Sequence, residues 1–179
     1  MKKKACLVVI DVQSAFLGPE PMLTSEGNDL LDKVSALLDK ARLAKVPVLY
    51  VEHVGFGAER PPEDLIPTHP RIAPRAGEPV TRKLYGDVFV GTSFNAELKS
   101  RGIRHLVLCG LATNGCLNAA CTRARALGYD VTVVEDANAC ASGDPAGKTA
   151  AAIVGEFVAS WKELGVGLAN SRAIDFTKF

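Results

Sequence analysis

The sequence predicts a single α/β domain, spanning 1–179, in which a doubly wound, mostly parallel sheet lies between two layers of helices. The first observation is size: 179 residues is the usual length of one domain, and 47% hydrophobic residues are enough for one large core. The second is that short runs rich in Val and Leu recur without alternation of polar and apolar residues, which is typical of strands buried on both faces. The third is that helical patterns separate these runs, as in sheets built from right-handed crossovers.

Six apolar runs predict the strands. The clearest are 5–10, 46–54, 105–111 and 130–137, and two weaker runs are 79–83 and 166–170. Four helices are predicted between them: 28–45, a second from Thr92 or Ser93 as N-cap to Gly102, a third from Cys116 to Gly128, and a fourth at 145–164. The segment 55–79 breaks the rhythm, because it is rich in Pro and Gly and has no periodicity. Such a segment is either a lid or a packed surface excursion, and the sequence leaves both open.

The charge pattern argues against nucleic acid and membrane partners. Lysines and arginines number 21 against 20 acidic residues, and no block of one sign could follow a phosphate backbone. The apolar run after the N-terminal lysines stops at Asp11, so no export signal is predicted, and no run reaches the roughly 20 residues that cross a bilayer. A cytoplasmic protein is expected. Its five cysteines are an odd number without C-x-x-C spacing, so neither disulfides nor a zinc ribbon is expected.

Three residues of chemical interest follow predicted strands. Asp11 comes directly after the first strand, Lys83 ends the strand at 79–83, and Cys116 begins the helix that follows 105–111. Because ligands bind beyond the carboxyl ends of parallel strands, these three side chains are expected to converge. A thiol at a helix N-terminus near a lysine feels a positive potential that favours thiolate, and an aspartate can accept its proton. The sequence therefore predicts Cys116 as a nucleophile.

The segment before Cys116 suits acyl transfer. Residues 110–115 are small and polar, so their backbone N–H groups could form an oxyanion hole. Each residue of the set could also have a purely structural role, since a lone Asp often caps a turn, a lone Lys is usually solvated and a lone Cys usually fills a core. His53 and His69 lack a third ligand at useful spacing, so pocket-lining or structural roles are preferred, and no metal or cofactor is expected.

The motifs together resemble the isochorismatase-like cysteine hydrolases over almost the whole chain. The matching stretches are Val9 to Gln13 with Phe16, His69-Pro70 through Gly77-Glu78, Lys83 with Phe89, Thr92 and Phe94, and Gly110 to Leu117 followed by Ala124 and Gly128. The resemblance implies a three-layer Rossmann-like fold and a homo-oligomer, dimer or tetramer, that acts on a small molecule.

The resemblance also implies residue roles. Asp11 would be the general base, Cys116 the nucleophile, and Lys83 the residue that orients and charge-stabilises both. A non-proline cis peptide between Leu111 and Ala112 would turn the N–H groups of Ala112 and Cys116 toward an oxyanion. The residues expected to bind substrate are Gln13, Phe16, Tyr85, Phe89 and Asn114, although burial in the core is an equal alternative for the two phenylalanines.

Differences from the family pattern reduce the number of reactions that are expected. The metal motif of family nicotinamidases is replaced here by Glu52-His53-Val54-Gly55, which speaks against a zinc-dependent nicotinamidase. Members that hydrolyse the vinyl ether of isochorismate lack the cysteine that this chain has at 116. The expected activity is therefore hydrolysis of a C–N bond in an amide, ureide or carbamoyl compound through a thioester. The alternatives are an isochorismatase-type ether hydrolase, a thiol redox protein using Cys116, for which Cys121 is a poor resolving cysteine because it faces differently along the helix, or a catalytically idle binding or scaffold protein.

Overall fold

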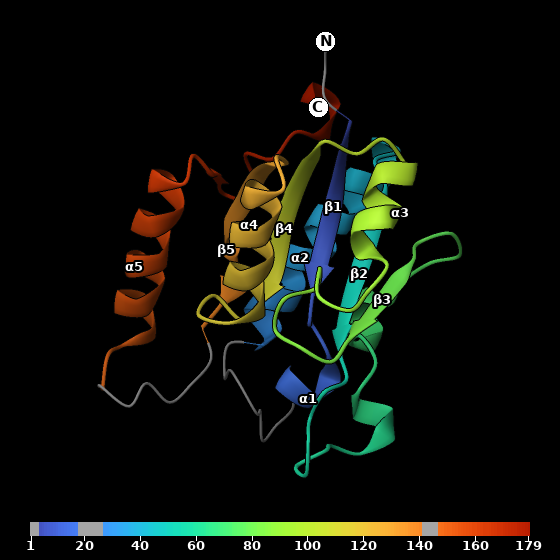
Figure 1. Cartoon of the computed structure of the whole chain (residues 1–179), viewed down its shortest axis with the longest axis vertical. Helices are drawn as coiled ribbons and strands as arrows, with labels where there is room; N and C mark the ends of the chain where they lie inside the picture. Colours follow the sequence, from blue (N-terminus) through green and yellow to red (C-terminus); the bar gives the residue numbers. More distant parts are fainter. Residues whose placement is uncertain (1–3, 18–26, 141–146) are drawn as a thin grey trace.

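The structure, a computed structural model, describes residues 4–17, 27–140 and 147–179 and contains one six-stranded parallel sheet in the order β3-β2-β1-β4-β5-β6 (Figure 1). The strands are β1 (Ala5–Ile10), β2 (Val48–His53), β3 (Val80–Lys83), β4 (His105–Leu111), β5 (Asp130–Ala139) and β6 (Gly167–Ala169). The helices are α1 (Ser14–Leu17), α2 (Gly27–Leu43), α3 (Phe94–Ser100), α4 (Cys116–Ala126) and α5 (Ala150–Glu163), with short 3-10 helices η1 (Glu63–Leu65), η2 (Pro70–Ile72) and η3 (Phe176–Lys178).

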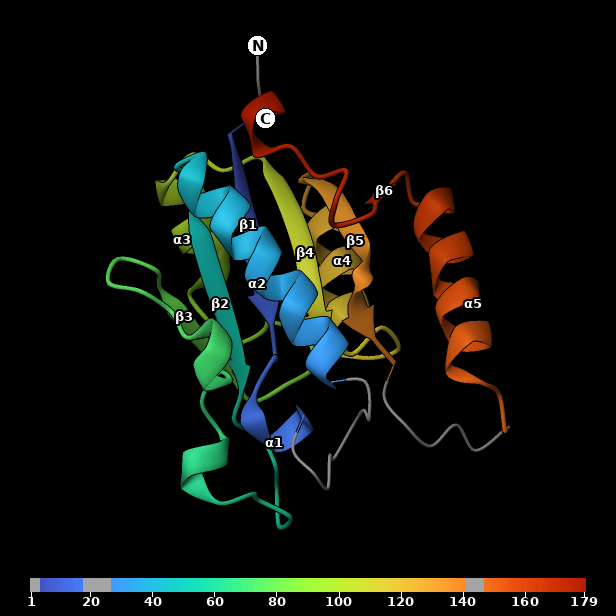
Figure 2. The same ribbon diagram turned by 180° about the vertical axis from the view of Figure 1, so that it is seen from behind.

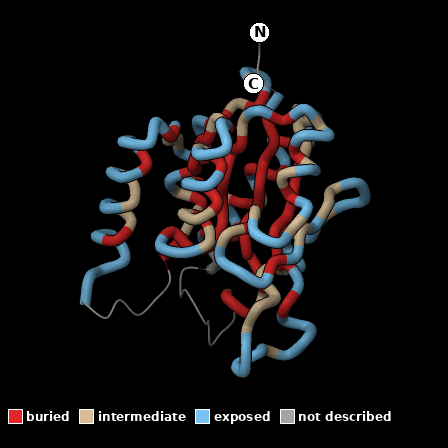
Figure 3. Tube along the Cα trace, viewed as in Figure 1, coloured by how far each residue is buried: buried red, intermediate tan, exposed pale blue. Residues whose placement is uncertain are grey.

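Helices cover both faces of the sheet, as the apolar strands require. Helix α2 lies across one face, seen from the front in Figure 2, and α3 and α4 lie across the other, seen from the front in Figure 1. Alternate residues of β1 therefore enter two cores: Leu7 and Val9 pack under α2, and Cys6, Val8 and Ile10 pack under α3 and α4. Figure 3 shows the resulting buried strands between more exposed helices. The predicted fold class is confirmed.

Differences from the predicted elements concern their ends. Strand β2 begins at Val48, two residues later than predicted, and the carbonyl of Pro47 accepts a hydrogen bond from the Leu7 N–H at its edge. Strand β5 continues to Ala139, past the predicted end at residue 137, with an irregular register against β4 between Leu108 and Gly110. Helix α5 begins at Ala150, and the start of the predicted segment at residues 145 and 146 lies outside the described residues. No helix within the described ranges is both long and apolar enough to cross a membrane.

The connectivity creates a switch point between β1 and β4. The chain proceeds from β1 outward to β2 and β3, then returns to β4 and continues outward on the other side. Crossovers leave the sheet in opposite directions here, which opens a crevice at the carboxyl ends of these two strands. Asp11 follows β1 and residues 112–115 follow β4, so both lie at this crevice.

The segment at 55–79 is mostly exposed, but its middle part is anchored to the domain. Thr68 pairs with Gln13 in an isolated antiparallel bridge, and Ile66 and Ile72 are buried. Buried Glu52 accepts hydrogen bonds from both the N–H and the hydroxyl of Thr68. These contacts favour the packed excursion over a lid for this part of the segment, because a lid would have to break buried hydrogen bonds in order to open.

Candidate active site

Asp11 leaves β1 with an unusual backbone conformation. Its φ of +53° lies in the left-handed region, which Asp tolerates better than most side chains, while its N–H still donates to the Val51 carbonyl at 2.9 Å. The side chain is almost fully buried. Such a conformation at the end of a buried strand is often found at functional sites, where the surrounding structure holds it in place.

Gly110 allows β4 to approach β1 closely beside Asp11. A Cβ atom at this position would lie 2.1 Å from the Ile10 carbonyl oxygen, and its φ of +116° is one that L side chains rarely adopt. Glycine is therefore required here for steric and for conformational reasons. The close approach brings the segment after β4, including Cys116, next to the carboxylate of Asp11.

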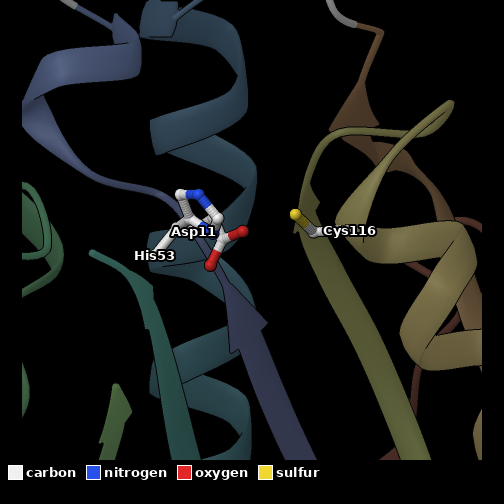
Figure 4. Close-up of side chains that lie close together, drawn as sticks. All are labelled: Asp11, His53 and Cys116. Atoms are coloured by element: carbon white, nitrogen blue, oxygen red, sulfur yellow. The ribbon is translucent and has the colours of Figure 1, made fainter. Parts of the chain in front are cut away.

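The side chain of Lys83, at the end of β3, contacts residues from three other segments that meet at the crevice. Lys83 pairs with His53 in the β2–β3 register, and its buried ammonium Nζ lies 2.7 Å from Oδ2 of Asp11 and 3.1 Å from Sγ of Cys116. The third neighbour of Nζ is Nδ1 of His53, also at 3.1 Å. Figure 4 shows Asp11 and His53 beside each other, facing Cys116 at the start of α4. The three predicted residues Asp11, Lys83 and Cys116 are thus brought together.

The surroundings of Cys116 favour a neutral thiol at rest. Burial and the neighbouring Asp11 carboxylate raise the pKa of Cys116 to about 11, although the Lys83 ammonium lowers it in part. The positive potential expected from a helix N-terminus and Lys83 is thus outweighed at rest, since burial has the larger effect. Attack by this sulfur requires a base that takes its proton.

Asp11 has the properties of that base. Burial raises the pKa of Asp11 above its usual range, while Lys83 and interactions with Cys116 and His53 partly offset the rise. Its Oδ2 accepts the Lys83 hydrogen bond, whereas Oδ1 is the buried side-chain oxygen without a hydrogen-bond partner in the described parts of the chain. A raised pKa suits a group that must first accept a proton and later return it.

The segment between β4 and α4 presents free backbone donors. The peptide bond between Leu111 and Ala112 is cis, and the carbonyl of Ala112 accepts hydrogen bonds from the N–H groups of Gly115 and Leu117. Among the described residues, the N–H groups of Ala112 and Cys116 donate no backbone hydrogen bond. Both are available to an oxyanion, as the resemblance implies.

A cavity of about 270 Å³ opens onto Asp11 and Cys116. Its walls are mostly apolar and aromatic, and the Phe16 and Phe56 rings lie 5.6 Å apart between their centroids. The lining residues are Asp11, Phe16, His53, Gly55, Phe56, Ala112, Asn114, Gly115 and Cys116. An apolar cavity of this size with few polar groups fits a small organic molecule.

The structure separates the residues expected to bind substrate. Phe16 and Asn114 line the cavity, but Gln13, Tyr85 and Phe89 do not. Tyr85 is 60% exposed and Phe89 packs against Phe94, so neither forms a wall. The side chain of Gln13 is fully buried and bonded to the backbone of the β2 end, which makes it a structural brace. The direction of each side chain and the course of the loops decided these outcomes. Residue type alone indicates neither.

The two histidines take the pocket-lining and structural roles preferred from the sequence, but the contact of His53 with Lys83 was not predicted. His53 lines the cavity and contacts Lys83, whereas His69 caps η2, its Nδ1 accepting from the Arg71 N–H at 3.3 Å. Asp11, His53 and Cys116 offer three ligand atoms within 4.8 Å of one another, a set that could hold a metal ion. The Lys83 ammonium contacts all three residues, at Oδ2 of Asp11, Nδ1 of His53 and Sγ of Cys116, so a cation already lies beside this set.

Alkylation by iodoacetamide should report the resting state of Cys116. We expect its rate to rise about tenfold per pH unit from pH 7 to 10, because the thiolate is the reactive form and the pKa is raised to about 11. In Asp11→Asn the rate at pH 8 should increase, because the carboxylate that raises this pKa is gone while Lys83 remains. The buried thiols of Cys6, Cys109 and Cys121 serve as internal controls in peptide mass spectrometry. Equal or slower labelling of Cys116 in Asp11→Asn would contradict this electrostatic account.

Comparison with known proteins gives a consistent result. The Isochorismatase domain family matches residues 5–157. An isochorismatase from Pseudomonas putida KT2440 superposes with a TM-score of 0.87 at 27% identity, covering 96% of this chain and 90% of that one. N-carbamoylsarcosine amidase from Thermoplasma acidophilum superposes with a TM-score of 0.77 at 26% identity, covering 96% and 99%. Streptothricin hydrolase from Streptomyces noursei is 32% identical over 136 residues, which are 74% of this chain and 49% of that protein, so the match spans about half its length.

Proposed function

The chain belongs to the isochorismatase family, and from this we propose that it is a cysteine hydrolase that cleaves a carbon–nitrogen bond of a small amide, ureide or carbamoyl compound. The observation that carries the proposal is the Lys83 ammonium, which contacts both the carboxylate of Asp11 and the sulfur of Cys116 at one wall of the cavity. The structural likeness to an amidase and the sequence similarity to a hydrolase support the same reaction class.

Acylation begins with a proton transfer inside the cavity. Oδ1 of Asp11 takes the thiol proton, and Sγ of Cys116 attacks the carbonyl carbon of the substrate. Negative charge that develops on the carbonyl oxygen is held by the N–H groups of Ala112 and Cys116. The C–N bond then breaks, the leaving nitrogen takes the proton back from Asp11, and a thioester remains on Cys116.

Deacylation uses the same groups in reverse roles. Asp11 accepts a proton from a water molecule as that water attacks the thioester carbonyl. The second tetrahedral intermediate occupies the same oxyanion site, and its collapse expels Cys116, which recovers the proton. The negative charge passes from Asp11 through the sulfur of Cys116 to the oxyanion and back, and the Lys83 ammonium stays in contact with both Asp11 and Cys116.

Three alternatives are less well supported by the site. A redox cycle would need a resolving thiol, but Cys121 lies on the buried face of α4 and does not line the cavity. An ether hydrolase of the isochorismatase type would leave the thiol at 116 without a role. An idle scaffold would have no need for a buried ion pair placed against a thiol in an open cavity.

The proposal is tested by ammonia release from a panel of small amides, ureides and carbamoyl compounds at equal concentration. We expect turnover of at least one class, and intact-mass analysis after rapid acid quench should show an acyl adduct that peptide mapping assigns to Cys116. Hydroxylamine should trap the acyl group as a hydroxamate. Ammonia release without any adduct or hydroxamate, or with an adduct on another residue, would contradict the thioester route.

A further inference from the structure

We propose that His53 is a positioning residue of this site: its neutral imidazole accepts the third hydrogen bond of the Lys83 ammonium and so holds Nζ between Asp11 and Cys116. The inference rests on the proposed hydrolase function, but it concerns a residue outside the Asp11, Lys83 and Cys116 set. This role of His53 is inferred from the position of its side chain at the end of β2, and no sequence motif indicates it.

The ammonium of Lys83 has three hydrogens and no lone pair, so each of its three neighbours must act as an acceptor. The neighbours are Oδ2 of Asp11 at 2.7 Å, Nδ1 of His53 at 3.1 Å and Sγ of Cys116 at 3.1 Å. The His53 ring is therefore neutral and carries its proton on Nε2. Lys83 is only 1% exposed, so its hydrogen-bond partners are these protein groups.

The His53 ring is held by rigid neighbours. The buried amide of Gln13 donates to the His53 carbonyl at 3.0 Å and accepts from the His53 N–H at 2.7 Å, which fixes the backbone at the end of β2. The ring packs edge-on against Phe56, with centroids 5.4 Å apart. At Gly55 a Cβ would lie 2.1 Å from the Leu84 carbonyl oxygen, so the two strand ends can approach only because this residue is glycine.

The surroundings keep this imidazole uncharged. The ionisable groups that face it are Asp11 from β1, Lys83 from β3 and Cys116 from α4. Burial lowers the pKa of His53 and Lys83 lowers it further, whereas Asp11 and the Gly55 backbone raise it in part. A protonated ring would lose its acceptor at Nδ1 and would bring two cations into contact. The His53 ring can therefore hold the Lys83 ammonium in place only while it is neutral.

Positioning matters because the negative charge of the site moves during the reaction. It starts on Asp11 and passes to Cys116 when the thiol is deprotonated. An ammonium held in contact with both atoms stabilises either state without rearrangement, which is the condition for electrostatic catalysis in a dry site. Without the His53 acceptor, Nζ is free to lean toward Asp11, where the negative charge is greater at rest, and Cys116 loses its support.

The test compares two replacements of similar size. In His53→Asn the side-chain oxygen can accept at the place of Nδ1, whereas His53→Leu has no acceptor. We expect His53→Leu to lower kcat on a substrate found in the panel by about 10²-fold with little change in KM, and His53→Asn to keep kcat within about fivefold of wild type. His53→Leu should also shift the pH midpoint of Cys116 alkylation upward, while His53→Asn leaves it in place.

The alkylation readout needs no substrate, so it stays informative even if the panel shows no turnover and the proposed function fails. If His53→Leu does not fold, His53→Ala takes its place, and imidazole added to the cavity should restore Cys116 reactivity in that variant. The proposal is overturned if both replacements shift the alkylation midpoint equally, if neither shifts it, or if imidazole gives His53→Ala no recovery.

Discussion

Replacing Cys116 by serine should lower kcat/KM for amide hydrolysis by about 10⁴-fold or more, the order of loss found when the nucleophile of a hydrolase is removed. A hydroxyl is far less acidic than a thiol, so Asp11 cannot generate enough alkoxide for attack at neutral pH. Cys116 is partly exposed at the cavity wall and contributes little to the core. The free energy of unfolding should therefore change by no more than about 0.5 kcal/mol. Ammonia release and urea denaturation, measured on the same preparation, check both parts.

Cys121→Ser is the matched control, because it makes the same chemical change on the same helix. Cys121 is fully buried, so this variant should lose stability while keeping turnover. The opposite pattern, with turnover retained by Cys116→Ser and lost in Cys121→Ser, would remove Cys116 from the mechanism. A loss in both would point to a role for the thiol pair and favour redox chemistry.

Replacing Lys83 by methionine should reduce the free energy of unfolding by about 3–5 kcal/mol, the usual effect of removing one partner of a buried ion pair. Methionine keeps the length and most of the apolar volume of lysine but leaves the carboxylate of Asp11 buried without its counter-charge. The side chains of Lys83 and Asp11 are 0% and 2% exposed, so solvent cannot screen the remaining charge. Urea denaturation at pH 8 measures the loss.

The double variant Asp11→Asn/Lys83→Met separates charge from packing. Asparagine tolerates the left-handed backbone at position 11 as aspartate does, and it carries no charge. We expect the double variant to recover most of the stability that Lys83→Met loses, which a double-mutant cycle expresses as a coupling free energy. Two single losses that simply add would show that no coupling exists and that the lysine acts only by filling space.

The loss in Lys83→Met should also depend on pH with a defined sign. Burial raises the pKa of Asp11 and Lys83 offsets part of that rise, so without the lysine the folded-state pKa lies still higher. A group whose pKa is raised on folding binds its proton more tightly in the folded state, and the protein loses stability as pH rises through that range. The penalty should be smaller at pH 4 than at pH 8. A penalty independent of pH would contradict the electrostatic explanation.

The fold and the three central residues could be predicted because they depend on local patterns and on one topological rule. Apolar runs that do not alternate imply a parallel sheet, and parallel strands end at one edge, so Asp11, Lys83 and Cys116 converge whatever the details of packing. The exact strand ends were less predictable, because β2 and β5 stop where pairing partners stop. Pairing is a property of two strands and not of one sequence segment.

The walls of the cavity could not be predicted in the same way. Tyr85 and Phe89 follow Lys83 closely in sequence, yet one is exposed and the other packs under α3, while Phe56 reaches the cavity from a segment with no periodic pattern. Gln13 shares a motif with Asp11 but turns into the core to brace the backbone of His53. These outcomes depend on side-chain direction, which is set by the course of the loops.

The sequence by itself determined a parallel α/β domain and the carboxylate, ammonium and thiol that meet at one edge of its sheet, because buried parallel strands follow from the hydrophobic pattern and their carboxyl ends share that edge. Only the tertiary structure decided the protonation of that site and its fourth member. The Lys83 ammonium beside Cys116 favours the thiolate, but burial in the folded domain and the Asp11 carboxylate outweigh it and leave a thiol. His53 joins Lys83 because register places β2 and β3 side by side, and burial depth and register exist only once the chain has folded.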